Sequence, residues 1–139
     1  MSQMTFTGSC LCGSVQYKVS GEALRFYHCH CGRCRKMTGT GHATNIMIKA
    51  ETVDWLKGAS LLGYYKIPEA ERFFNQFCKQ CGSALPRWVP ARGMVVIPAG
   101  SLDSGLDIKP EARIFWNSRA EWSCEASELP AFSEYPETG

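Results

Sequence analysis

The 139-residue sequence lacks long apolar runs, internal repeats, linkers and low-complexity segments. No apolar stretch approaches the roughly eighteen residues that a membrane helix needs, and no basic start followed by an apolar run opens the chain. We therefore expect a cytoplasmic protein without a membrane partner. With 45% apolar residues, the chain is long enough for one globular domain over residues 1–139. We expect its core over about 5–122 and a loose tail over about 133–139.

A strong excess of one charge is also missing, since the formal net charge is only +2. The one basic concentration is Arg33, Arg35 and Lys36, which is a local feature and not a basic stripe. Proteins that bind nucleic acid usually carry such a stripe or patch. The composition therefore predicts that nucleic acid is not a partner.

Cysteine is too sparse for a disulfide scaffold, although the chain has eight cysteines. Without a secretion signal, the thiols should stay reduced. The cysteine spacings of ferredoxins are also missing, which disfavours an iron–sulfur cluster. The metal is still an inference, because tetrahedral sulfur sites accept iron as well as zinc.

Seven of the eight cysteines lie in three tight clusters, which are Cys10-Leu-Cys12, Cys29-His-Cys31-Gly-Arg-Cys34 and Cys78-Lys-Gln-Cys81. Zinc in proteins is nearly always four-coordinate, so four protein ligands close a structural site and three leave a position for water or substrate. Seven thiolates divide naturally as four plus three. The sequence therefore predicts two zinc ions per chain, one for folding and one for chemistry.

The spacing within the clusters suits this geometry, which brings sulfurs to about 3.8 Å from one another. Cys10 and Cys12 are two positions apart and would share one face of a strand. Cys78 and Cys81 must curl around the metal, and Gly82 permits backbone conformations that other residues avoid. A single Cys-x-x-Cys could instead be a redox motif, but three clusters together favour metal binding.

The residues alone do not decide which clusters share a metal. Either N-terminal cluster could join Cys78 and Cys81. Compactness favours the trio Cys29, Cys31 and Cys34 around one ion, because six residues hold all three. The two remaining cysteine pairs would then close the other site.

Period-two patterning predicts a mostly antiparallel β fold, as Val15, Tyr17 and Val19 show by alternating with polar residues. Further expected strands are Leu24–His28, Ala43–Lys49, Leu61–Ile67, Arg72–Phe77, Ala84–Val89, Met94–Ile97 and Ala112–Trp116. Two short helices are expected, at Arg33–Thr38 before Gly39 and at Cys124–Leu129 before Pro130.

These motifs resemble the glutathione-dependent formaldehyde-activating enzyme family, also called the centromere-protein-V/GFA domain. The resemblance rests on the three cysteine clusters with Gly13, Gly39 and Gly82, on Ala99-Gly-Ser-Leu-Asp103, and on the segment Ile114-Phe-Trp116 with Trp122. It runs from about Thr5 to Trp122.

The resemblance implies a single-domain β-tent, a distorted antiparallel β-sandwich-like arrangement with short helical turns and two zinc sites. It implies a structural zinc on Cys10, Cys12, Cys78 and Cys81, and a catalytic zinc on Cys29, Cys31 and Cys34. The implied activity is that of a carbon–sulfur lyase that joins glutathione and formaldehyde.

Three thiolates around a zinc dication favour delivery of a nucleophile over polarisation of a carbonyl group. We therefore expect a small-molecule thiol as cosubstrate and a small electrophile as its partner. Arg33 and Arg35 are candidates for binding the carboxylates of the thiol, with a solvated turn as the simpler interpretation. The alternatives are a zinc-stabilised binding module without catalysis and a thiol redox sensor.

The remaining candidates have ordinary structural interpretations. His28 and His30 could replace a cysteine ligand or transfer a proton, and His42 could assist them. Asp103 is expected to be a turn residue, and Cys124 a buried apolar one. Most of the aromatic residues are expected in the core, although they could line a substrate cleft: Tyr64, Tyr65, Phe73, Phe74, Trp88, Phe115, Trp116 and Trp122.

Overall fold

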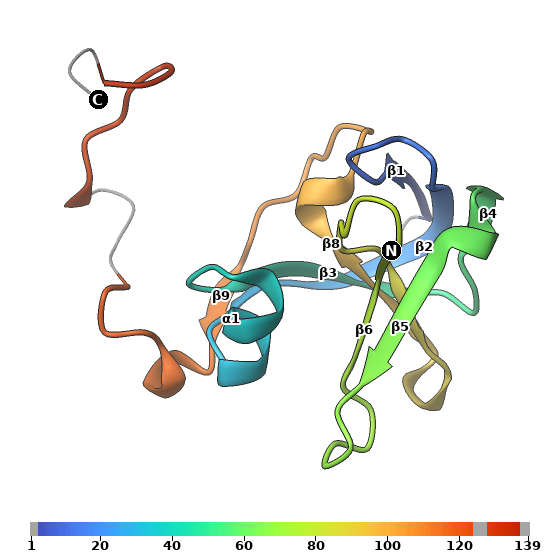
Figure 1. Ribbon diagram of the computed structural model, residues 1–139, viewed down its shortest axis with the longest axis horizontal. Coiled ribbons are helices and arrows are strands. Elements are labelled where there is room, and N and C mark those ends of the chain that lie inside the picture. The colour runs from blue at the N-terminus through green and yellow to red at the C-terminus, as the bar shows by residue number, and fades with distance from the viewer. Residues whose placement is uncertain (1–2, 124–127, 137–139) are drawn as a thin grey trace.

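A computed structural model describes residues 3–123 and 128–136. Seven strands form one curled sheet, in which β1, β2, β3, β8 and β7 follow one another and β4 and β9 pair with β2 (Figure 1). Strands β5 and β6 form a separate two-stranded sheet. The strands are β1 Met4–Ser9, β2 Gln16–Cys29, β3 Ala43–Lys49, β4 Asp54–Lys57, β5 Leu62–Lys66, β6 Phe74–Cys78, β7 Arg87–Val89, β8 Met94–Pro98 and β9 Ala112–Ile114.

Among the described residues, the helical elements are α1, Gly32–Thr38, and single 3-10 turns. The turns are η1 Ala59–Leu61, η2 Pro90–Arg92, η3 Ala99–Ser101 and η4 Trp116–Ser118. Helix α1 ends at Gly39, whose φ of 70° is left-handed and whose amide donates to the carbonyl of Arg35. The mainly β fold predicted from the sequence is therefore confirmed.

The 14-residue strand β2 organises the sheet. Its first half pairs with β1 and β4, and its second half pairs with β3 and β9. The pairing with β3 shifts register between Ala23 and Arg25, and such a bulge bends a strand and increases its twist. The bend lets one strand serve both halves of the curled sheet.

The core lies against the inward faces of β1, β2, β3 and β8. Its members share almost complete burial, and the largest of them are Phe6, Tyr17, Ile46, Ile48, Leu85 and Ile97. Cys10 and Cys78 belong to this cluster. The four-cysteine group therefore touches the core, whereas Cys29, Cys34 and Ala43 form a second, smaller cluster at the far end of β2.

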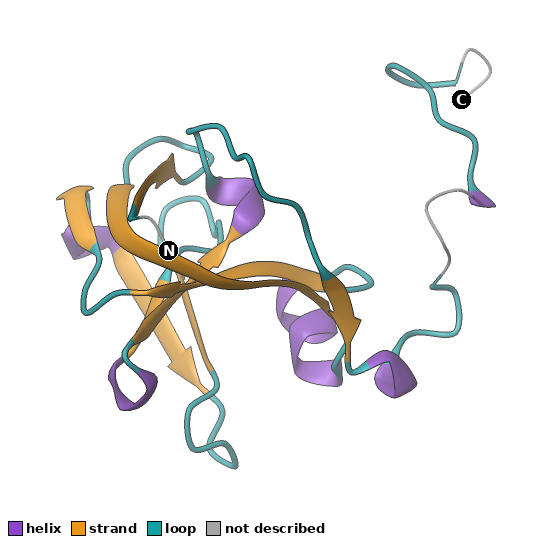
Figure 2. Cartoon of the chain, turned by 180° about the vertical axis from the view of Figure 1, so that it is seen from behind, coloured by secondary structure: helices purple, strands orange, loops and turns teal. Residues whose placement is uncertain are grey.

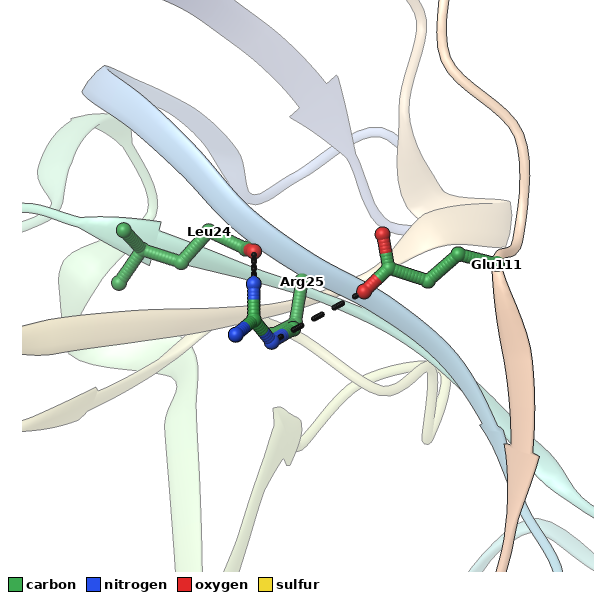
Figure 3. Close-up of polar contacts among 3 residues, drawn as sticks. All are labelled: Leu24, Arg25 and Glu111. Carbon is green, nitrogen blue, oxygen red and sulfur yellow. Dashed lines mark hydrogen bonds and ion pairs between the residues drawn. The ribbon is translucent and has the colours of Figure 1, made fainter. Parts of the chain in front are cut away.

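An ion pair marks the point where the chain returns to β2 before β9. Arg25 donates through Nη1 to the carbonyl oxygen of Leu24 at 2.8 Å, and its Nε lies 3.9 Å from Oε1 of Glu111 (Figure 3). Both charged side chains are at least half exposed, so the pair adds little stability. The backbone amide of Glu111 also donates to the carbonyl oxygen of Phe26. This bond comes just before β9, which pairs with the end of β2 up to Cys29.

Helix α1 and the β5–β6 hairpin lie on the same side of the long β2–β3 ladder (Figure 2). Cys34, the buried residue of α1, belongs to the small cluster at the end of β2. The tip of the hairpin carries Phe73, which packs against this cluster. The fold therefore brings α1, the end of β2 and the hairpin tip together around three cysteines.

Several strands differ from the sequence prediction. The expected runs Val15–Val19 and Leu24–His28 are parts of one strand, because the bulge lets pairing continue through Gly21 and Ala23. Strands β1 and β4 were not predicted from the sequence. One pairing, β9 with β2, is parallel. Most of the helix expected at Cys124–Leu129 lies outside the described residues.

Candidate functional site

Four cysteine sulfurs from distant parts of the chain meet in one group. The Sγ atoms of Cys10, Cys12, Cys78 and Cys81 all lie within 4.8 Å of one another. Cys10 and Cys12 follow β1, Cys78 ends β6, and Cys81 lies in the turn after it. The Cys10–Cys12 and Cys12–Cys78 sulfur distances are 3.6 and 3.9 Å, close to the spacing of sulfurs around a tetrahedral zinc ion.

Two similar turns aim these sulfurs at one point. The amide of Gly13 donates to the carbonyl of Cys10 at 3.0 Å, and the amide of Gly82 donates to the carbonyl of Cys78 at 2.7 Å. Both glycines have left-handed φ angles, 77° and 79°. A side chain at either position would strain the backbone, because L-residues other than glycine rarely adopt this conformation.

Backbone amides also point at the sulfurs of this group. Val15 donates to Cys10 Sγ at 3.3 Å and Gln80 donates to Cys78 Sγ at 3.4 Å. The Gln80 side chain donates to Cys12 Sγ at 3.3 Å. Donors around sulfur favour the thiolate, which is the form that binds metals.

The thiols of this group are electrostatically unequal. The Ser83 hydroxyl, 3.2 Å from Cys81 Sγ, lowers the pKa of Cys81 to about 5. Hydrogen bonds from Ser14 lower the pKa of Cys12, whereas burial raises the pKa of Cys78. A metal dication would favour ionisation of all four sulfurs, so the donor set fits a structural zinc ion.

A second group consists of Cys29, Cys31 and Cys34, whose sulfurs also lie within 4.8 Å of one another. Cys29 ends β2, Cys31 is the N-cap of α1, and Cys34 lies within α1. The amide of Cys34 donates to Cys31 Sγ at 3.3 Å, so the helix start itself orients one of the three sulfurs. Cys29 and Cys34 are buried and Cys31 is partly exposed.

The three thiols cannot all ionise without a counter-charge. The Cys34 thiol, as a hydrogen-bond donor, lowers the pKa of Cys29 to about 6. The same contact raises the pKa of Cys34 far above its ordinary value, and burial raises it further. Three sulfurs that compete for one negative charge fit a bound cation. Within the described chain, this candidate metal-binding group contains no histidine or carboxylate.

One functional candidate that sequence reasoning missed is Arg87 on β7. Its guanidinium lies close enough to Cys34, Cys29 and Cys31 for their charges to raise its pKa, which opposes the larger lowering by burial. Nη1 of Arg87 donates to the carbonyl of Phe74 at 3.0 Å. A lone cation in the apolar stretch Ala84–Val89 is the feature of the sequence that could have identified it.

Arg33 and Arg35, the two arginines expected to bind carboxylates, lie on either side of Cys34 in α1. The guanidinium carbons of Arg33 and Arg87 lie 5.8 and 5.6 Å from the centre of the Phe73 ring. Arg33 and Arg87 line a cavity of about 370 Å³ together with Arg72 and Arg92. Arg35 lines a neighbouring cavity instead, and the two cavities share Arg33 and Phe73 as a common wall.

All three histidines of the sequence gather beside β2, and none of them belongs to a cysteine group. The ring centres of His28 and His42 are 4.1 Å apart, and those of His30 and His42 are 5.0 Å apart. Thr44 Oγ1 lies within hydrogen-bond distance of Nδ1 in both His28 and His42. Burial lowers the pKa of both His28 and His30. The geometry groups these histidines with one another and not with the candidate metal-ligating cysteines.

The other residues singled out from the sequence lie elsewhere. The Asp103 carboxylate accepts a 2.6 Å hydrogen bond from the Ser9 hydroxyl, and the Asp103 amide donates to Thr7. Several of the aromatic side chains expected in the core are exposed, namely Tyr64, Tyr65, Trp88, Phe115 and Trp122, so that expectation is wrong for them. Cys124 lies outside the described residues.

No helix among the described residues is both long and apolar enough to cross a membrane.

Two comparisons with known proteins give the same family, and a third gives a similar fold. A family model described as "Glutathione-dependent formaldehyde-activating enzyme" matches residues 5–118. A protein of Halomonas elongata named "Putative glutathione-dependent formaldehyde-activating enzyme" is 33% identical over 150 aligned positions, which cover 96% of this chain and 90% of that protein. The crystal structure of a Rhodobacter sphaeroides protein matches with a TM-score of 0.57 and 21% identity, over 79% of this chain and 98% of the other. This last likeness concerns the fold alone.

Proposed function

The chain belongs to the glutathione-dependent formaldehyde-activating enzyme family, and on this premise we propose that it is a zinc-dependent enzyme of the carbon–sulfur lyase type. It joins a thiol such as glutathione to formaldehyde or another small electrophile. The observation that carries the proposal is that the chain forms a group of three cysteines in addition to the group of four. Four thiolates complete a tetrahedral zinc site, whereas three leave one position for a substrate.

In this proposal, Cys10, Cys12, Cys78 and Cys81 hold a structural zinc ion, and Cys29, Cys31 and Cys34 hold a catalytic one. When bound, the catalytic ion supplies a position at which a substrate thiol loses its proton. The protein contributes the fixed geometry. Cys31 is held as a helix N-cap and Cys34 one turn later, so both sulfurs are oriented before substrate arrives.

Arg33 and Arg87 position the thiol by its carboxylate. Guanidinium groups bind carboxylates through two parallel hydrogen bonds, and the cavity lined by these arginines adjoins the three cysteines. Arg87 has a second effect, because its positive charge offsets part of the negative charge of three thiolates. A thiol with a carboxylate at one end therefore fits better than an uncharged or cationic thiol.

The reaction is an addition without net oxidation or reduction. The substrate sulfur attacks the carbonyl carbon and forms a carbon–sulfur bond. The π electron pair of the carbonyl group moves to its oxygen, which takes up the proton that the thiol released. The product is an S-hydroxymethyl adduct when the electrophile is formaldehyde. The chemistry requires reduced cysteines, so we propose a reducing compartment such as the cytoplasm as the site of action.

The proposal is tested by following exchange between formaldehyde and its glutathione adduct by NMR. Wild-type protein should accelerate this exchange, and a Cys34→Ser variant should reduce it to the uncatalysed rate. The matched control is Leu56→Ser, which changes a 59% exposed residue of β4 and should leave the rate unchanged. Unchanged turnover in Cys34→Ser after loss of one metal ion would contradict the proposal.

A further inference from the structure

A second cavity adjoins the three cysteines, between α1 and the β5–β6 hairpin. Its volume is about 540 Å³ and its wall is mostly apolar. Helix α1 contributes Gly32, Arg33, Arg35, Lys36 and Met37, and the hairpin contributes Tyr65, Ile67, Phe73 and Asn75. Phe73 also packs against the cluster of Cys29 and Cys34, so one side chain forms the wall between the cavity and the candidate reaction site.

This cavity is much too large for formaldehyde. A water molecule occupies about 30 Å³ of liquid volume, and formaldehyde has only one more heavy atom. Cavities of about 300–1,000 Å³ with mostly apolar walls typically hold organic ligands of metabolite size. The apolar surfaces of Ile67, Met37 and Phe73 would stabilise such a ligand by removing its apolar body from water.

The polar side of the cavity is cationic. Arg33, Arg35 and Lys36 line it, and no acidic residue is among its lining residues. Nε of Arg35 is buried and has no hydrogen-bond partner among the described residues. A buried donor without an acceptor is rare in folded proteins and costs stability. The three cationic side chains that line the cavity therefore favour a ligand with an anionic oxygen.

We propose that the electrophile of this enzyme is a carbonyl compound with an apolar, aromatic-sized body and a carboxylate. The body lies against Ile67 and Phe73, and the carboxylate pairs with Arg35. This assignment rests on the proposed function and names the substrate class for it. In this assignment Arg35 pairs with the carboxylate of the electrophile, whereas Arg33 and Arg87 pair with the carboxylate of the thiol.

The step itself is the same addition. The thiol sulfur bonds to the carbonyl carbon, the π pair moves to the carbonyl oxygen, and that oxygen gains the thiol proton. The product is a hemithioacetal, and no oxidant or reductant is needed. Gly32 and Arg33 line the cavity and lie between Cys31 and Cys34 in the chain, so the cavity is next to the helical turn that carries these two cysteines.

Binding is tested first, without catalysis, by calorimetric titration of the zinc-loaded full-length protein with 2-naphthoate. This probe has an aromatic body and a carboxylate but no reactive carbonyl group. We expect it to bind at least about tenfold more tightly than formate, which lacks the body, and than 2-naphthamide, which lacks the charge. Equal binding of all three compounds, or no saturable binding, would overturn the proposal.

Variants then locate the binding. Arg35→Gln and Ile67→Asp should each weaken 2-naphthoate binding at least about tenfold. The matched controls are Arg25→Gln and Leu56→Asp, which change exposed residues away from the cavity and should leave affinity unchanged. Unchanged affinity in both cavity variants, with folding verified by circular dichroism, would place the probe elsewhere and overturn the proposal.

Turnover by the wild-type protein separates this inference from the proposed function. With glutathione as the thiol, 4-formylbenzoate should have a kcat/KM at least about tenfold above that of benzaldehyde, which lacks the carboxylate. Turnover of formaldehyde but of neither aromatic aldehyde would overturn the inference alone. No turnover of any of the three aldehydes would overturn the proposed function.

Discussion

The Sγ atom of Cys12 lies 3.9 Å from the Sγ atom of Cys78, although 66 positions separate the two residues in the sequence. Cys12 follows β1 of the large sheet, whereas Cys78 ends β6 of the separate hairpin. The Leu11 amide donates to the Ser83 hydroxyl and supports the same junction. Closing such a long loop costs chain entropy. A metal ion bound here would hold the hairpin against the sheet, and its binding free energy would offset that cost.

The junction predicts a large loss of stability in a Cys12→Ser variant. Cys12 is exposed, so the substitution changes little packing, but it removes one of the four proposed ligands. We expect the free energy of unfolding to fall by at least about 3 kcal/mol. The melting temperature should fall by about 10 °C or more. Calorimetry on protein purified without chelators measures both.

Leu11→Ser is the matched control for this variant, because Leu11 is the 89% exposed neighbour of Cys12. It should leave the melting temperature within about 2 °C of the wild type, as expected for surface substitutions. If Cys12→Ser were as stable as Leu11→Ser, the four cysteines would not form a structural metal site.

Gly82 provides a test of the turn that positions Cys78 and Cys81. Its φ of 79° is left-handed, and a Cβ at this position would meet nothing within 4 Å. Gly82→Ala should therefore cost about 1–2 kcal/mol from the backbone alone. Gly100 has the same open surroundings without a left-handed φ, so Gly100→Ala is the control and should cost much less. Denaturant unfolding of both variants measures the difference, and equal costs would contradict a strained turn.

The cysteine clusters made the candidate site predictable, because ligand spacing is a local property of the chain. Helix α1 was predictable for the same reason, since Gly39 ends it, whereas its cap at Cys31 was found only in the structure. The sequence singles out Arg87 as a lone cation in an apolar stretch, but its position beside the three cysteines was not predictable, because it depends on the pairing of β7 with β8. The cavity between α1 and the hairpin likewise depends on tertiary structure.

Strand β1 shows why some elements escape prediction. Its sequence Met-Thr-Phe-Thr-Gly-Ser has only two strongly apolar residues, so alternation is weak. The strand forms because Phe6 is buried in the core and Gly8 packs against the ring of Tyr17, with no room for a side chain. Long-range packing and not local propensity decides this element.

The buried phenol of Tyr17 should make the protein less stable at high pH. Burial raises its pKa from 10.0 to about 12. The unfolded chain therefore loses the phenol proton first, and stability falls as the pH rises from about 10 to about 12. The loss is on the order of 2 kcal/mol for this fully buried residue.

Tyr17→Phe removes this ionisation and is the variant for comparison. Denaturant unfolding at several pH values between about 9 and 12 should show a shallower loss of stability in Tyr17→Phe than in the wild type. The variant also loses the 2.6 Å contact with Ser101, which lowers its stability at every pH but does not change the slope. Parallel pH profiles for the two proteins would show that Tyr17 does not titrate as proposed.

The division of the seven cysteines into a closed and an open site is tested most directly by counting metal ions. Wild-type protein purified without chelators should contain two zinc ions per chain by mass spectrometry or atomic emission. Cys31→Ser should contain one zinc ion and retain the wild-type circular dichroism spectrum, because the four-cysteine site is unchanged. Two zinc ions in Cys31→Ser, or only one in the wild type, would contradict the account.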